Sequence, residues 1–495
     1  MVARSRFTLT RAATVLVLVL VAAVALRASA LLTPRTIAAA PLRPNIVVIL
    51  SDDQPTMGTL GVMPNVNALI RDQGVQFYRA HIVDPLCCPS RAALITGQYS
   101  HNNGVWDNTT DALGAAALVP TLDNTLGPWL QAAGYQTGYI GKWLNNAPVA
   151  RPPGWTRFER LYREGYYDFT WVDDSGAVVP YTPGQGVYST DLVADQAAAA
   201  VERFSSTGQP FFLVVAPYGP HASQREDVRG ELVPIPATRH HGALGSPDDI
   251  VVPSLGGAYL QADVSDKPQW VKDQAAFSPL ARDVAFHRRY WILMLETLMA
   301  VDELVGRVVG ALDRTGQLSN TLVVYYSDNG FSVGHHGYFG KRAPYAESVA
   351  VPMLVRGPGV APNTVRNEIV SNLDLVATIV ELSGARPGRL LDGRSLVPLL
   401  RGDLVPWRSE LLIEGRASSL EFWAGIQTKT MKYIETAEAR GQFQELYDLQ
   451  STGELVNLAG SPGRAAPYVA YLRGRLQALS ACAGDTCWSA GGLIP

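Results

Sequence analysis

A cysteine pair followed by proline, serine and arginine is the stretch of this chain best suited to chemistry. It runs Cys87-Cys88-Pro89-Ser90-Arg91 and leads into an apolar segment. Proline in the first turn of a helix places Cys87 beside the helix N-terminus, where free backbone amides favour anions. We expect a thiol there to have a lowered pKa and to be reactive. Arg91, about one turn further on, could hold that group or a bound oxyanion. Taken alone, the stretch could equally be a structural cysteine pair in a loop.

Acidic residues follow two apolar runs that are typical of buried strands. Ser51-Asp52-Asp53 comes after residues 45–50, and Ser327-Asp328-Asn329-Gly330 comes after residues 321–326. In open parallel sheets, ligands bind just beyond the carboxyl ends of the strands. Three carboxylates and an amide oxygen meeting there would form an all-oxygen cation site, suited to Ca²⁺ or Mg²⁺. Either sequence alone is an ordinary turn or helix cap. Their occurrence together, with the cysteine pair between them, favours the cation site.

These motifs together resemble type I sulfatases of the alkaline-phosphatase superfamily, from about residue 44 to about residue 460. In that family the first cysteine of the Cys-x-Pro-Ser-Arg signature is oxidised to formylglycine by a formylglycine-generating enzyme. The resemblance therefore implies that Cys87 is converted to this aldehyde. It also implies a calcium (or magnesium) site whose ligands are Asp52, Asp53, Asp328, Asn329 and residue 87. Glu445-Leu446-Tyr447-Asp448-Leu449, with Asn457-Leu458, resembles a C-terminal signature of the family that is structural.

The same resemblance assigns roles to residues that would otherwise be ordinary surface positions. Lys142, in Gly141-Lys142-Trp143, and Lys341 match the two sulfate-binding lysines. His221 matches a histidine that contacts sulfate and can protonate the leaving group, and His336 matches a position that supports its loop. His101 could line the substrate side.

A mechanism follows from this resemblance. One hydroxyl of hydrated formylglycine attacks sulfur, the alcohol leaves with a proton from His221 or Lys341, and the second hydroxyl expels sulfate. The two lysines, Arg91, the cation and the helix N-terminus neutralise the developing charge. The expected substrate is a sulfate monoester of a sugar or an aryl alcohol. The alternatives are a formylglycine-dependent phosphonate or phosphodiester hydrolase and a non-catalytic exported carbohydrate-binding protein.

Two departures from the family pattern bear on the substrate. Many sulfatases have histidine two residues after the first lysine, where this chain has Leu144 followed by Asn145. With the cysteine pair and Gly97-Gln98-Tyr99-Ser100-His101-Asn102, this form resembles the N-acetylglucosamine-6-sulfatase and heparan 6-sulfatase branch. The group that deprotonates the hydrate stays open, because an asparagine cannot act as a base at neutral pH. In the later loop, Ala346 and Ala350 replace ionic residues of the family.

These residues can meet only if several strands end at the same edge of one sheet. The pattern along the chain predicts such strands. Apolar runs at residues 45–50, 135–140, 211–216 and 321–326 alternate with helical patterns at 124–133 and 290–312. This predicts an α/β fold with a doubly wound, mixed but mostly parallel sheet flanked by helices. Residues 148–190 and 222–280 are expected to be long surface insertions. Shorter strands at 410–413, 422–428, 431–434 and 444–448, with a helix at 465–479, predict a smaller antiparallel α+β subdomain.

Net charge and the N-terminal sequence bear on the partners and the location of the protein. The chain has 495 residues and a net charge of −3, which does not suggest a nucleic-acid partner. Arginines 4, 6 and 11, an apolar run and Ala28-Ser29-Ala30 predict a secretory signal peptide at 1–30 and a secreted or cell-envelope protein, with an uncleaved membrane anchor as the alternative. We expect a linker at 31–43, a catalytic domain at 44–400 and a C-terminal subdomain and tail at 401–495. Export agrees with an expected Cys482–Cys487 disulfide. The oligomeric state is left open.

Overall fold

A computed structural model describes residues 43–223, 232–254, 256–417, 421–439, 441–461, 463 and 465–488. The predicted signal peptide and all but the last residue of the predicted linker lie outside the described residues. Among the residues that are described, no helix is long and apolar enough to cross a membrane.

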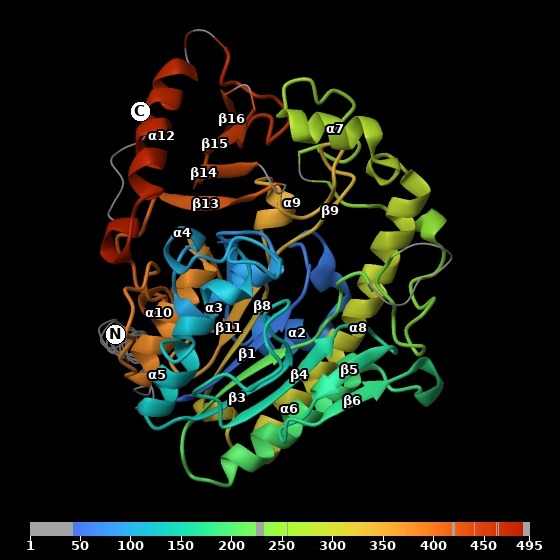
Figure 1. Ribbon diagram of the computed structural model, residues 1–495, viewed down its shortest axis with the longest axis vertical. Helices are drawn as coiled ribbons and strands as arrows, with labels where there is room; N and C mark the ends of the chain where they lie inside the picture. The colour runs from blue at the N-terminus through green and yellow to red at the C-terminus, as the bar shows by residue number, and fades with distance from the viewer. Residues whose placement is uncertain are drawn as a thin grey trace, which may run out of the picture. The chain divides into compact units, whose positions relative to one another are not determined.

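A ten-stranded sheet forms the centre of the molecule (Figure 1). Strands β8, β1, β7, β3 and β4 are consecutive neighbours and run parallel, whereas β11, β5 and β6 pair antiparallel to their neighbours. In spatial order the strands are β12 Thr364–Ser371, β2 Val75–His81, β11 Met353–Arg356, β8 Thr321–Ser327, β1 Asn45–Ser51, β7 Phe211–Ala216, β3 Gln136–Lys142, β4 Arg157–Arg163, β5 Phe169–Val172 and β6 Val178–Tyr181. The predicted mixed, mostly parallel sheet is confirmed.

Helices cover both faces of this sheet, which explains why its central strands are apolar throughout. Successive side chains of a strand point to opposite faces. In β1, Ile46, Val48 and Leu50 therefore pack into one core, and Val47 and Ile49 pack into the other. The second of these cores contains the long helices α6 Ser189–Ser205 and α8 Val284–Arg314, with the short α2 Pro64–Val66. The first contains α3 Cys87–Thr96, α5 Leu126–Ala132, α10 Asn372–Ser383 and α11 Val397–Arg401.

A separate four-stranded antiparallel sheet follows in the C-terminal part of the chain, as predicted. Its strands are β13 Glu410–Arg416, β14 Phe422–Thr428, β15 Met431–Glu438 and β16 Gly441–Asp448. Helix α12 Ala465–Leu479 lies beside this sheet (Figure 1). Its Leu472 and Leu476 belong to the same hydrophobic cluster as residues of the four strands. The expected Cys482–Cys487 disulfide is present.

Short elements complete the described chain. They are α4 Ser100–Asn103, α7 Gln269–Phe277, α9 Ala346–Val349 and the two-stranded ribbon of β9 Ser332–Val333 and β10 Phe339–Gly340. Single helical turns lie at Thr59–Val62, Asn67–Arg71, Ala115–Ala117, Val119–Thr121, Pro183–Gln185, Pro247–Asp249, Pro279–Ala281, Leu318–Asn320 and Gly484–Cys487.

The prediction that residues 148–190 form a surface insertion is wrong, because β4, β5 and β6 extend the central sheet from this stretch. The charges of β4 hid it from a search for apolar runs. Arg157 forms a buried ion pair with Glu159 at 2.6 Å, and Glu159 also accepts a hydrogen bond from Trp171 Nε1. Charged residues can therefore occupy this buried strand because they pair with one another.

Candidate active site

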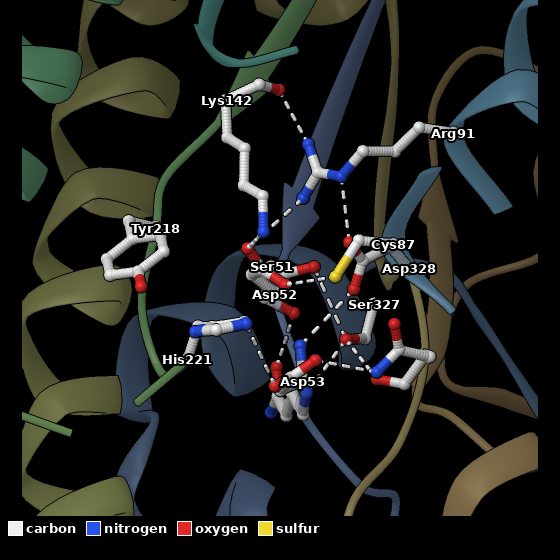
Figure 2. A network of polar contacts seen from close by, with 12 residues as sticks. Ser51, Asp52, Asp53, Cys87, Arg91, Lys142, Tyr218, His221, Ser327 and Asp328 are labelled. Carbon is white, nitrogen blue, oxygen red and sulfur yellow. Dashed lines mark hydrogen bonds and ion pairs between the residues drawn. The ribbon is translucent and has the colours of Figure 1, made fainter. Parts of the chain in front are cut away.

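The carboxyl ends of four neighbouring parallel strands bring the predicted site residues together (Figure 2). Asp52 and Asp53 follow β1, Asp328 and Asn329 follow β8, Lys142 ends β3, and Tyr218 and His221 follow β7. Cys87 is the first residue of α3, as its sequence context predicts. Parallel strands force their carboxyl ends to one edge of the sheet, so segments far apart in the sequence converge there.

Asp52 lies at the centre of the cluster and is fully buried. One of its oxygens lies 3.6 Å from Cys87 Sγ, and the other contacts Lys142 Nζ and lies 3.6 Å from the Arg91 guanidinium. Burial alone would raise the pKa of Asp52, but Lys142 and the neighbouring cations outweigh burial and lower it. Asp52 is therefore an anion that holds two cations in place.

Arg91 ties two strands to the cluster. Its Nε donates to Asp328 Oδ2 at 2.8 Å, and a terminal nitrogen donates to the carbonyl of Lys142 at 2.6 Å (Figure 2). Burial raises the pKa of Asp328 to about 6, helped by Asp52 and opposed by Arg91. Arg91 thus positions Asp328 and the end of β3.

Lys341 reaches the cluster from a loop. Its ammonium donates to Asp53 Oδ1 at 2.6 Å and contacts Cys87 Sγ at 2.7 Å. Asn329 Nδ2 donates to the same Asp53 oxygen at 2.7 Å. The two lysines therefore approach residue 87 from different elements: Lys142 touches Asp52, whereas Lys341 contacts Sγ directly.

His221 stands on the β7 side of the cluster (Figure 2). Its Nδ1 donates to the carbonyl of Ala222 at 2.6 Å, so Nε2 is left to face Asp53 Oδ2 at 3.5 Å. The ring stacks on Tyr218 with 4.9 Å between ring centroids. Burial lowers the pKa of His221 to about 4. Asp53 acts in the opposite direction, but Lys341 and Lys142 offset part of its effect. The imidazole is consequently neutral at neutral pH.

The expectation of a lowered pKa for the Cys87 thiol is wrong. Burial raises the pKa of Cys87 to about 11, although Lys142 and Lys341 act in the opposite direction. Burial likewise raises the pKa of Cys88 to about 12, and Cys88 packs among the apolar residues between α3 and the sheet. A buried thiol without a compensating base is a poor nucleophile. The unmodified Cys87 thiol is therefore a weak nucleophile.

Unpartnered oxygens show that the cluster fits a cation. Ligand atoms of Asp52, Asp53, Cys87 and His221 all lie within 4.8 Å of one another. The buried atoms Asp53 Oδ2 and Asn329 Oδ1 have no hydrogen-bond partner within the described part of the chain. Buried oxygens without partners are costly unless an ion or water satisfies them. Carboxylate and amide oxygens are hard ligands, which suit Ca²⁺ or Mg²⁺.

Two residues near the cluster were not predicted. Tyr218 places its ring centroid 5.4 Å from Lys142 Nζ. Glu164 directly follows β4, which is parallel to β3, and burial raises its pKa against the influence of Lys142. Recognition of 157–163 as a strand would have indicated Glu164, since its end lies at the same edge.

Other residues singled out by sequence take other positions. His101 bonds Glu414 at 2.8 Å and the carbonyl of Cys482 at 3.0 Å, so it holds the C-terminal tail. Leu144 is buried. His336 contacts Gln261.

Fold and site together define a hydrolase of the alkaline-phosphatase type, and comparison with known families narrows the class. Residues 44–385 match the sulfatase family, and residues 334–481 match the C-terminal region described for N-sulphoglucosamine sulphohydrolase. The chain belongs to the sulfatase family.

Named relatives agree with this assignment. The chain is 32% identical over 517 residues to an arylsulfatase of Volvox carteri, covering 91% of this chain and 77% of the relative. It is 32% identical over 404 residues to the N-acetylglucosamine-6-sulfatase of Homo sapiens, covering 76% and 68%. It is also 33% identical over 397 residues to the extracellular sulfatase SULF-1 homolog of Drosophila melanogaster, covering 77% of this chain but spanning only 34% of that relative.

Solved structures share the fold. A protein solved in complex with its substrate D-glucosamine-2-N,6-O-disulfate superposes with a TM-score of 0.71 at 25% identity, covering 88% of this chain and 97% of the other. A phosphonate monoester hydrolase from Silicibacter pomeroyi reaches a TM-score of 0.69 at 22% identity over 88% and 95%, which shows the shared fold alone.

Proposed function

We propose that this sulfatase hydrolyses the sulfate monoester of a sugar, using formylglycine derived from Cys87 and one divalent cation. The observation that carries the proposal is the position of Cys87 at the head of α3. There it contacts Asp52 and Lys341 and lies within 4.8 Å of a carboxylate oxygen of Asp53. Hydrated formylglycine would supply a nucleophilic hydroxyl and a second hydroxyl for release of sulfate.

The residues around position 87 have different roles in the proposed reaction. Lys142 and Lys341 lie on two sides of residue 87, where their ammonium groups can neutralise the charge of a bound sulfate. Arg91 holds Asp328 and β3 in place. Lys341 would supply the proton to the departing alcohol, since its ammonium pairs with Asp53 beside residue 87. A neutral His221 whose proton lies on Nδ1 has none to give from Nε2 and would accept a hydrogen bond there.

Calcium is the cation we propose, with magnesium as the alternative. Asp52, Asp53, Asp328 and Asn329 would hold it, and it would polarise the oxygen at residue 87 as a Lewis acid. Asp53 adopts a left-handed backbone conformation with φ of 67°. Such a conformation is uncommon for a residue other than glycine and is often found at functional sites.

A sulfated amino sugar is the substrate class that the relatives favour. One relative is named N-acetylglucosamine-6-sulfatase, and the substrate in one similar structure carries a 6-O-sulfate on glucosamine. We therefore propose 6-O-sulfated N-acetylglucosamine or a related glycan as the first compound to test. Aryl sulfates are second, because the Volvox relative is named arylsulfatase.

Export and maturation are part of the same proposal. The N-terminal pattern at 1–30 supports a secreted or cell-envelope protein, and the Cys482–Cys487 disulfide supports an oxidising compartment. A formylglycine-generating enzyme would act on Cys87 before folding, because the folded protein buries this residue completely. The division into a catalytic domain at 44–400 and a C-terminal subdomain at 401–495 is proposed on the change from the mixed to the antiparallel sheet.

Peptide mass spectrometry around residue 87 tests the nucleophile. Conversion of thiol to aldehyde lowers the mass by about 18 units, or leaves it nearly unchanged once hydrated, which separates it from sulfenic and sulfinic products. An active enzyme whose Cys87 is entirely unmodified would refute the proposal.

A phosphodiester or phosphonate hydrolase is the second candidate, because a phosphonate monoester hydrolase shares the fold. Relative kcat/KM on matched aryl sulfate, phosphodiester and phosphonate esters decides between them. A higher value for either phosphorus ester would overturn the sulfatase proposal.

A further inference from the structure

A second buried group of ionisable side chains lies outside the catalytic cluster. His336, Glu347 and Glu454 place one ligand atom each within 4.8 Å of the others, although Glu454 is over a hundred residues from Glu347. His336 and Glu347 are each 1% exposed. We propose that these three residues bind a divalent transition-metal ion, with Zn²⁺ as the first candidate.

Unsatisfied atoms are the first observation that carries the proposal. Neither carboxylate oxygen of Glu347 has a hydrogen-bond partner within the described residues, and the same holds for His336 Nε2. A buried carboxylate without partners is strongly unfavourable. The ring of His336 is oriented so that Nδ1 donates to Gln261 Oε1 at 2.8 Å, which directs Nε2 toward the carboxylates. A metal-binding histidine is commonly fixed in this way by a hydrogen bond from its other nitrogen.

The spacing of the atoms is the second observation. His336 Nε2 lies 3.6 Å from Glu347 Oε2 and 3.9 Å from Glu454 Oε2. Both separations are too long for a hydrogen bond, so a proton on Nε2 does not bridge these groups. Neighbouring ligands of a tetrahedral zinc ion, each about 2.0–2.1 Å from the metal, lie about 3.4 Å apart. His336 Nε2 thus needs to approach each of the two carboxylate oxygens by only about half an ångström or less.

The charges around Glu347 and Glu454 also favour a bound cation. Lys432 pairs with Glu454 Oε1, and the Glu454 oxygen nearer His336 accepts a hydrogen bond from the Ala346 amide at 2.8 Å. Glu347 has only His336 at ion-pair distance among the residues that the structure describes. A divalent cation would supply the positive charge that Glu347 lacks. Imidazole with two carboxylates suits zinc and similar ions, whereas Ca²⁺ and Mg²⁺ prefer oxygen ligands alone.

A pocket is lined by residues that adjoin the site. A pocket of about 580 Å³ is lined by Gln261 and Leu455, which are respectively the hydrogen-bond partner of His336 and the neighbour of Glu454. His336 and Glu347 flank Lys341 on either side in the sequence. The ion would therefore fix both ends of the loop that delivers Lys341, and would join that loop to the segment after β16.

Metal content is the direct test, and it does not depend on catalytic activity. Full-length mature protein is loaded with Zn²⁺ and Ca²⁺, passed over a desalting column and measured by inductively coupled plasma mass spectrometry. We expect one zinc per chain, and its loss in E347Q and in H336Q with calcium unchanged. E445Q is the matched control, because Glu445 is a buried neighbour whose carboxylate accepts hydrogen bonds from Tyr345 and Tyr447. It should keep the zinc.

A spectroscopic measurement guards against misfolded variants. Co²⁺ replacing Zn²⁺ should give the visible absorption of a tetrahedral site in the wild type and in E445Q, and none in E347Q. Zn²⁺ should also raise the Tm of the wild type by about 2 °C or more, with no shift in H336Q. Wild-type protein that binds no zinc, or zinc that persists in both E347Q and H336Q, would overturn the proposal.

Discussion

The two buried acidic clusters differ in how the chain balances their charge. In the catalytic cluster every carboxylate touches a cation: Asp52 and Asp328 touch Arg91, and Asp53 touches Lys341. In the second cluster Lys432 pairs with Glu454, whereas among the described residues only His336 lies within ion-pair distance of Glu347. This balance of charge agrees with the proposal that the catalytic cluster binds an anionic substrate as well as a metal. The second has carboxylates in excess and is suited to a cation alone.

The largest expected loss of activity comes from replacing residue 87, the proposed nucleophile. Cys87→Ser cannot be converted to the aldehyde, so it lacks the second hydroxyl that would release sulfate. We expect a loss of at least about 10³-fold in kcat, with sulfate trapped on the serine and detected by intact mass. Normal multiple turnover by this variant would exclude the mechanism. As a control, E347Q leaves residue 87 unchanged and should show no trapped sulfate.

Removal of one lysine from each cluster tests whether the two are independent. Lys142→Met removes an ammonium that faces the sulfate site, so kcat/KM should fall about 10²–10³-fold. Lys432→Met leaves Glu454 without its buried partner, so unfolding free energy should fall by about 3 kcal/mol with kcat changed less than tenfold. Urea denaturation and steady-state kinetics measure both. Equal losses of activity in the two variants would show that the clusters act as one.

Selective chelation sharpens the same contrast without mutation. Removal of calcium with EGTA, in a buffer that holds free Zn²⁺ constant so that the second cluster stays loaded, should lower turnover at least about 100-fold because the proposed cation would polarise the nucleophile. A zinc-selective chelator should lower Tm and leave calcium bound, with a smaller loss of kcat. Thermal unfolding, metal analysis and kinetics on the same samples provide the readouts. Full activity after confirmed removal of calcium would contradict the proposed cation role.

The smallest effect on activity is expected far from both clusters. Cys482→Ser with Cys487→Ser opens a short disulfide loop whose loss should cost about 2 kcal/mol of stability by the chain-entropy estimate. The tail contacts His101 and Asn102 through the Cys482 carbonyl. We expect kcat to stay within twofold of the wild type, measured beside urea denaturation. A tenfold loss would place the tail contact in the substrate site.

Residues at the ends of apolar strands were the predictable part of the site. Asp52, Asp53, Asp328 and Asn329 follow strands whose burial on both faces leaves a continuous apolar run, so their convergence could be expected from the pattern. Strand β4 escaped prediction because Arg157 and Glu159 neutralise each other inside the sheet. Glu164, which follows it, was therefore missed as well.

Properties set by tertiary packing could not be predicted locally. The helix N-terminus at Cys87 indicated a lowered pKa, but complete burial reverses the direction. The grouping of His336 with Glu347 and Glu454 has no spacing signal, because a loop, a four-residue helix and the segment after β16 must first pack together. Ion pairs and burial of this kind arise only from the assembled fold.

The loop that carries Lys341 has a consequence for the order in which the enzyme matures. Lys142 lies at the end of a strand, so the central sheet alone can position it. Lys341 lies between His336 and Glu347, and both face a residue of the segment after β16. During synthesis this lysine cannot reach its final place until residue 454 has left the ribosome and long-range contacts have formed. A fragment ending near residue 400 would contain every strand of the central sheet and still lack the contacts that hold one of the two lysines proposed to bind sulfate.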